Sequence, residues 1–113
     1  MTVHAAWYEG KRGSGVCYGE SIERRGSVRP ILKPLPLRLD LYPHSPTGFE
    51  WGYGGSGPAQ LALAILAHAC GDETALRYYQ RFKQNIVANL ANSWHLDRQY
   101  VVDWVESQKE KEK

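Results

Sequence analysis

The sequence predicts an α+β domain in which a small antiparallel sheet of three to four strands packs on three helices, the first of them buried. Two observations support this class. The first half of the chain consists of short apolar segments separated by turns, as in β-hairpins. In the second half, apolar residues recur at helical spacing. With 113 residues, of which 42% are hydrophobic, the chain is expected to form one domain over residues 1–108, followed by a charged, frayed tail at residues 109–113.

The first strands are expected around a glycine-rich turn. Residues 3–8 and 16–18 are rich in apolar and aromatic side chains, and the turn at residues 10–15 separates them. They are therefore predicted to form a hairpin. Residues 28–32 are a further strand candidate, which Pro30 interrupts.

The clearest strand is predicted for residues 35–41, where four leucines alternate with other residues. Because side chains alternate between the two faces of a strand, these leucines are expected to line one buried face. Pro36 cannot donate a ladder hydrogen bond, which favours a position at a sheet edge or at the end of the strand.

Three helices are predicted in the second half. The first runs from about residue 58 to residue 70 and ends at Gly71, a typical C-terminal stop. The second spans residues 72–92, and the third starts near Asp97.

The first helix is apolar around its whole circumference, since only Gln60 and His68 interrupt it. Such a helix is normally buried, so we expect it between the sheet and the other helices. The predicted core consists of Leu37, Leu39, Leu61, Ile65, Leu76, Ile86 and Trp104.

Charge is unevenly distributed along the chain. The formal net charge is only +2, but residues 11–38 contain seven cations and two anions, which gives this stretch +5. The two cysteines, Cys17 and Cys70, have neither disulfide-framework nor zinc-site spacing and are expected to be free thiols. No signal peptide and no membrane-spanning run is recognised, so a cytoplasmic protein is expected.

The best candidate for a binding site is the glycine-rich segment 44–57, HSPTGFEWGYGGSG. Glycines let backbone amides approach a ligand, and a helix N-terminus adds unpaired amides and partial positive charge. At least one of Gly54, Gly55 and Gly57 is expected to have positive φ. Neither a Walker lysine nor GxGxxG spacing is present, and the alternative is a close-packed start of a buried helix. The predicted ligand-binding residues are Trp51, Tyr53, Gly54, Gly55, Ser56 and Gly57, together with His44 and Arg38.

An enzymatic alternative rests on His44, Ser45 and Glu50, which supply a base, a hydroxyl and a carboxylate within seven residues. No G-x-S-x-G motif surrounds Ser45, and His44 is also typical of a turn, so no catalytic residue is assigned. His68 is expected to be a hydrogen-bonded core residue. The four histidines have no metal-ligand spacing, and neither a metal nor another cofactor is expected.

A third alternative uses the basic stretch 11–38. Its cations suit phosphate backbones, with Trp7, Tyr8 and Tyr18 as stacking partners. No known nucleic-acid motif is present, and a solvated sheet face explains the same residues.

Residues 44–66, HSPTGFEWGYGGSGPAQLALAIL, resemble a domain family of unknown function from bacteria, plasmids and phages. Supporting matches are residues 37–39, residues 79–83 and Trp94. The family has no established activity. Its association with mobile elements implies an accessory role, such as interference with a host defence system.

These observations favour a non-enzymatic binding module whose glycine-rich loop contacts a phosphate-bearing small molecule or a protein partner. The alternatives are a nucleic-acid or defence-complex inhibitor acting through residues 11–38, and the small hydrolase described above. Clustering of the early cations on one exposed face would favour the inhibitor.

Overall fold

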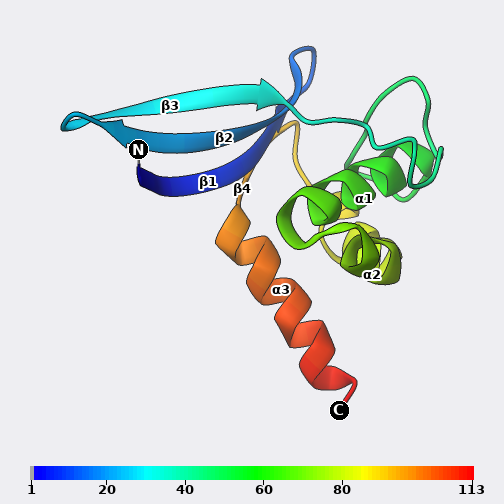
Figure 1. Ribbon diagram of the computed structural model, residues 1–113. Coiled ribbons are helices and arrows are strands. Elements are labelled where there is room, and N and C mark those ends of the chain that lie inside the picture. Colours follow the sequence, from blue (N-terminus) through cyan, green and yellow to red (C-terminus); the bar gives the residue numbers. More distant parts are fainter. Residues whose placement is uncertain (1) are drawn as a thin grey trace.

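The structure, a computed structural model, describes residues 2–113 and confirms the α+β class. Its elements are β1 (Thr2–Lys11), β2 (Gly15–Arg24), β3 (Ser27–Pro34), α1 (Ser56–Cys70), α2 (Asp72–Asn85), the 3-10 helix η1 (Val87–Asn89), β4 (Ser93–Asp97) and α3 (Arg98–Lys111). Figure 1 shows α1 and α2 packed together at one end of the sheet, while the long strands extend away from them. Within residues 2–113, no helix is long and apolar enough to span a bilayer.

The strands form one antiparallel sheet in the order β3-β2-β1-β4. The hairpin of β1 and β2 lies where the sequence predicts it, and the third predicted strand is present as β3. The fourth strand is β4, which pairs with β1 and directly precedes α3. The sequence pattern did not predict β4.

The strand predicted for residues 35–41 is wrong, because these residues form a loop. Leu35 still donates one ladder-like hydrogen bond from its amide to the carbonyl of Val16, at 3.1 Å. Pro36 then offers no amide, and Arg38 adopts a left-handed φ of 58°. A residue with positive φ ends an extended course, so the alternation of leucines does not produce a strand here.

Two of the predicted helices match closely, and the other is shorter than expected. α1 ends before Gly71, which has φ +95°, and α3 starts directly after Asp97. α2 was predicted to reach residue 92 but ends at Asn85. After η1 the chain turns away, and the carbonyl of Val87 accepts a hydrogen bond from the amide of Gly52 at 3.0 Å.

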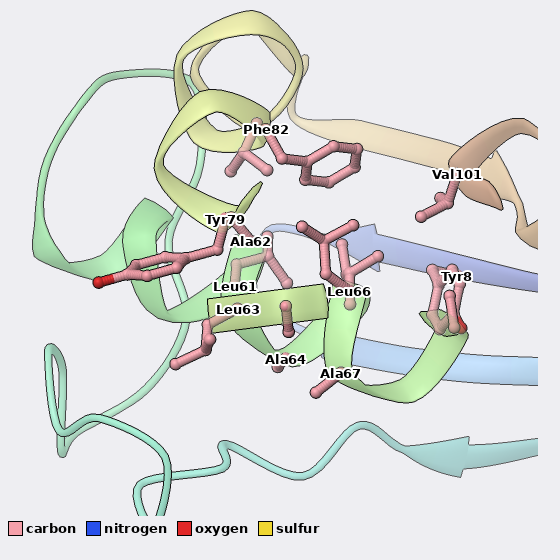
Figure 2. Packing of buried hydrophobic residues seen from close by; sticks show 14 of the residues in the cluster. Tyr8, Leu61, Ala62, Leu63, Ala64, Leu66, Ala67, Tyr79, Phe82 and Val101 are labelled. Carbon is pink, nitrogen blue, oxygen red and sulfur yellow. The ribbon is translucent and has the colours of Figure 1, made fainter. Parts of the chain in front are cut away.

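α1 lies at the centre of the core, as predicted. Every residue from Gly57 to Ala67 is buried. Figure 2 shows its side chains gathered with Tyr8 of β1, Phe82 of α2 and Val101 of α3. One helix therefore joins the sheet to both of the other helices.

Five of the predicted core residues are buried at least in part. Leu61 and Ile65 are fully buried, whereas Leu37, Ile86 and Trp104 are partly exposed. The assignment of Leu39 and Leu76 to the core is wrong, since they are 37% and 46% exposed. The buried stripe of α2 is formed by Ala75, Tyr78, Tyr79 and Phe82.

The glycines before α1 permit close packing. The expectation of positive φ at Gly54, Gly55 or Gly57 is wrong, and the positive φ values of this segment belong to Gly48 and Gly52, at 145° and 84°. Gly57 is constrained in another way: a Cβ atom there would lie 2.5 Å from Cβ of Glu50. The first turn of α1 therefore lies directly against the chain at Glu50.

Replacing Gly57 with alanine is expected to lower the free energy of unfolding by about 1–3 kcal/mol, because the added methyl group overlaps the Glu50 segment. Gly54→Ala is the matched control, since nothing lies within 4 Å of a Cβ atom at Gly54. Urea denaturation of both variants measures the difference. Equal stability of the two variants would contradict the close contact.

Candidate functional site

The glycine-rich segment is partly built into the core. Trp51 is 3% exposed, and its indole nitrogen donates to the carbonyl of Ala91 at 2.7 Å. Gly57 is also buried, whereas Gly54 and Ser56 are exposed and Tyr53 is 52% exposed. The structure thus separates the predicted ligand-binding residues into a buried group and an exposed group.

Gln60 fastens the loop before α1 to the helix. This fully buried side chain donates from Nε2 to the carbonyl of Leu37 at 2.6 Å. Its Oε1 accepts from the amide of Ser45 at 3.0 Å. His44 adds a second attachment, since its Nε2 lies 2.8 Å from the hydroxyl of Tyr79 on α2. These hydrogen bonds attach the loop between β3 and α1 to both α1 and α2.

Arg12, from the β1–β2 turn, is the cation beside the glycine-rich segment. Its guanidinium lies 4.5 Å from the centre of the Trp51 ring and donates to the Trp51 carbonyl at 2.8 Å. It also forms a salt bridge with the carboxylate of Glu50. The positive charge that a ligand anion would need at this segment is therefore paired with Glu50.

Arg38, which was expected to reach the glycine-rich segment, binds two carboxylates instead. It lies 3.0 Å from Asp40 and 2.8 Å from Asp72 at the start of α2. The hydrogen bonds to Asp72 and Asp40 raise the pKa of Arg38, and the same guanidinium lowers the pKa of Asp40. Arg38 thereby connects the loop to the N-terminus of α2, where negative charge is favourable.

The three residues of the enzymatic alternative have different partners. His44 is bonded to Tyr79, the Ser45 hydroxyl donates to the carbonyl of Gly48 at 2.6 Å, and Glu50 pairs with Arg12. Partial burial lowers the pKa of His44, and the nearby charge of Lys83 adds to this effect. None of these contacts joins His44 to Ser45 as a base to a nucleophile.

The seven cations of residues 11–38 are divided between different environments. Arg12 and Arg38 are held by carboxylates, as described above. Arg24, Arg25 and Arg29 gather at the end of the β2–β3 hairpin. Among residues 2–113, none of these three arginines forms a salt bridge.

The sheet register places most of the strand cations that lack a carboxylate partner on one face of the sheet. Residues that pair across β2 and β3 place their side chains on the same face of the sheet. One of the two faces includes Tyr8 and Tyr18, and at these residues it is covered by the helices. We call its β2 and β3 residues beyond Tyr18 the basic face. Its members are Glu20, Ile22, Arg24, Ser27, Arg29, Ile31 and Lys33.

The opposite side of the same strands has the reverse balance. Glu9 and Glu23 lie there with one strand cation, Lys11. Trp7 also belongs to this side, where it covers Gly19. The two sides of one thin sheet thus differ in sign, although the whole chain is nearly neutral.

A hollow of about 490 Å³ lies along the end of the basic face. Ile22 and Ile31 contribute apolar surface, and Arg24, Arg25 and Arg29 border it. Val3 of β1 pairs with the half-buried Ile22 in the register and is itself exposed. Figure 1 shows that this part of the sheet extends beyond α1 and α2.

The outer edge of β3 is protected from pairing with another strand. Because the amide of Leu35 bonds to Val16, the odd-numbered residues of β3 direct their amides toward β2. The even-numbered residues face outward, and two of them are Pro30 and Pro34, which have no amide hydrogen. Prolines at an edge oppose strand addition, so the exposed surface available to a partner is the face.

Sequence reasoning identified the basic stretch but not its apolar part. Ile22 and Ile31 gave a signal, since each lies two residues from an arginine on its strand, the spacing of side chains that share a face. Placing all four on one side required the β2–β3 register. His68, predicted to be a hydrogen-bonded core residue, is exposed rather than buried, although its ring is hydrogen-bonded to Tyr8.

A family model described as "Family of unknown function (DUF6166)" matches residues 8–107. The match covers most of the chain, and the chain therefore belongs to this family. No curated protein and no solved structure matches the chain.

Proposed function

We propose that this DUF6166 member is a non-enzymatic binding module that holds an acidic segment of a protein partner against the basic face. The observation that carries the proposal is the group of arginines at the hairpin end, which border apolar surface and have no carboxylate partner among residues 2–113. Arginine is enriched at the energetic centres of protein interfaces. In this proposal the glycine-rich segment supports the fold, and the hairpin makes the contact.

The chemistry of the basic face favours a protein over a nucleic acid. Ile22, Ile31 and the neighbouring Val3 are aliphatic, and they offer no ring on which a base would stack. Trp7 lies on the opposite side of the sheet, and Tyr8 is buried. Exposed aliphatic side chains between arginines suit a segment that carries both carboxylates and apolar side chains. Such a surface also fits the accessory role that the family resemblance implies.

Adjacent positions on β3 provide a direct test. A photoreactive amino acid at position 31 points to the basic face, whereas one at position 32 points to the opposite side. Ile31 and Leu32 are both exposed, so solvent access does not distinguish them. In cells that naturally produce the protein, we expect crosslinks to a protein from position 31 and not from position 32. Peptide mapping should place the crosslinked site in a segment rich in aspartate and glutamate.

Charge reversal gives the second arm of this test. Arg24→Glu combined with Arg29→Glu should lower the crosslinking yield at position 31 at least about tenfold, because close charge pairs at an interface become repulsive. Lys109→Glu combined with Lys111→Glu makes the same change of charge on α3 and should have little effect. Equal yields from positions 31 and 32, or adducts with nucleic acid, would contradict the proposal.

A further inference from the structure

A second hollow, of about 310 Å³, lies in the corner where the sheet meets α1 and α3. Its lining includes Tyr8 and Tyr18 from the strands, His68 from the last turn of α1 and Arg98 from the first turn of α3. Glu20 borders it on the sheet side. We call this hollow the corner pocket. It is at the small end of the range for ligand sites.

The imidazole of His68 is held in place by two aromatic residues. Its Nδ1 lies 2.8 Å from the hydroxyl of Tyr8, which is buried. The ring of Tyr18 lies against the imidazole, with 4.2 Å between ring centres. His68 is therefore positioned at the wall of the pocket while its side chain remains partly accessible to solvent.

Burial keeps the tyrosine and the histidine of the pocket neutral. Burial raises the pKa of Tyr8, and the positive charge of Arg98 opposes this rise only in part. Burial lowers the pKa of His68, Arg98 lowers it further, and Glu20 acts in the opposite direction. At neutral pH the two formal charges of this group of side chains are thus those of Arg98 and Glu20.

The hydrogen bond between Tyr8 and Nδ1 of His68 bears on which imidazole nitrogen carries the proton. Arg98 lines the same pocket as Tyr8, and its positive charge favours the orientation in which the phenol hydrogen points away from it. A Tyr8 hydroxyl that donates to Nδ1 leaves the imidazole hydrogen on Nε2. In this tautomer His68, which lines the pocket, carries its N–H donor at Nε2.

Arg98 and Glu20 are not paired with each other. Arg98 donates to the carbonyl of Ala69 at 3.2 Å, which fixes its side chain near the end of α1. Among residues 2–113, neither Arg98 nor Glu20 forms a salt bridge. The pocket therefore presents one cation, one anion and one neutral donor, and each lacks a charged protein partner.

We propose that the corner pocket binds a small zwitterion that carries a carboxylate and a protonated amine, the chemistry of a free α-amino acid. The carboxylate accepts hydrogen bonds from Arg98 and from Nε2 of His68, and the amine binds Glu20. Charged groups of both signs are satisfied at once, whereas an ordinary anion leaves Glu20 unpaired and is repelled by it. This site adjoins the surface proposed for the protein partner and shares Glu20 with it, but it does not depend on that proposal.

The wild-type protein tests the need for both charges. Amide and side-chain chemical shifts are followed during titration with glycine, L-leucine and L-glutamine, and with acetate and methylammonium as the two half-ligands. At least one amino acid should perturb Glu20, His68 and Arg98 and bind at least about tenfold more tightly than either half-ligand. Equal binding of acetate, or no perturbation of the pocket by any of the amino acids, would overturn the proposal.

Two variants assign the roles. Glu20→Gln should weaken amino-acid binding at least about tenfold without weakening the binding of acetate, which Glu20 repels, and Arg98→Gln should weaken the binding of both. Lys11→Gln, which removes one exposed charge on the opposite side of the sheet, is the control and should change neither. Nitrogen shifts of the wild-type imidazole give an independent readout, and a proton on Nδ1 of His68 instead of Nε2 would contradict the arrangement.

Discussion

Replacing Gln60 with alanine is expected to lower the free energy of unfolding by about 2–4 kcal/mol, because two backbone groups lose their buried partner. The amide of Ser45 and the carbonyl of Leu37 both bond to this side chain, which is fully buried in α1. Urea denaturation measures the loss. Gln80→Ala is the control, since Gln80 is an exposed helical glutamine for which the change should stay within about 0.5 kcal/mol.

A glutamate at the same position separates the two bonds of Gln60. Gln60→Glu retains an acceptor for the amide of Ser45, but an ionised carboxylate cannot donate to the carbonyl of Leu37. Burial raises the pKa of such a glutamate in the folded state above its value in the unfolded chain. Its protonated form is therefore the stabilising one, and that stability is lost as pH rises through the raised pKa. The deficit relative to wild type should shrink as pH falls toward about 4, and a constant deficit would contradict this role.

The helices and the first hairpin were predictable because their signals are local. The apolar run of α1 and the stop at Gly71 lie within one segment, as does the turn between β1 and β2. Residues 35–41 show the limit of a local pattern. Their alternating leucines match a strand. The carbonyl of Leu37, however, accepts a hydrogen bond from Gln60, 23 residues away, and this bond attaches the loop to α1.

The candidate surfaces were harder to predict because charge depends on distant partners. Arg38 and Arg12 belong to the same basic stretch as Arg24, yet each has a carboxylate partner far along the chain: Asp72 lies 34 residues after Arg38, and Glu50 lies 38 residues after Arg12. Composition alone could not show which cations remain unpaired. The corner pocket depends on contacts of this kind too, since Tyr8 and His68 are 60 residues apart.

The local sequence pattern also failed to identify which face of α2 is buried. Leu76 was placed there for its hydrophobicity and helical spacing, but the buried stripe begins one residue earlier at Ala75. Phe82, seven residues after Ala75, fills the position against Trp104 of α3, with 5.0 Å between ring centres. A shift of one residue rotates a helical stripe by about 100°, which is enough to turn a leucine from the core to solvent.

Truncating two aliphatic residues that were both predicted to lie in the core should therefore change the free energy of unfolding by very different amounts. Ile65→Ala is expected to lower the free energy of unfolding by about 2–5 kcal/mol, because Ile65 is fully buried and the cavity is enclosed by well-packed neighbours. Leu76→Ala should cost less than about 1 kcal/mol, since the side chain is exposed and alanine has the higher helix propensity. Thermal and urea denaturation of the two variants measure the contrast in one background. Similar losses for both variants would mean that Leu76 is buried in solution, and the orientation of α2 against α1 would then be wrong.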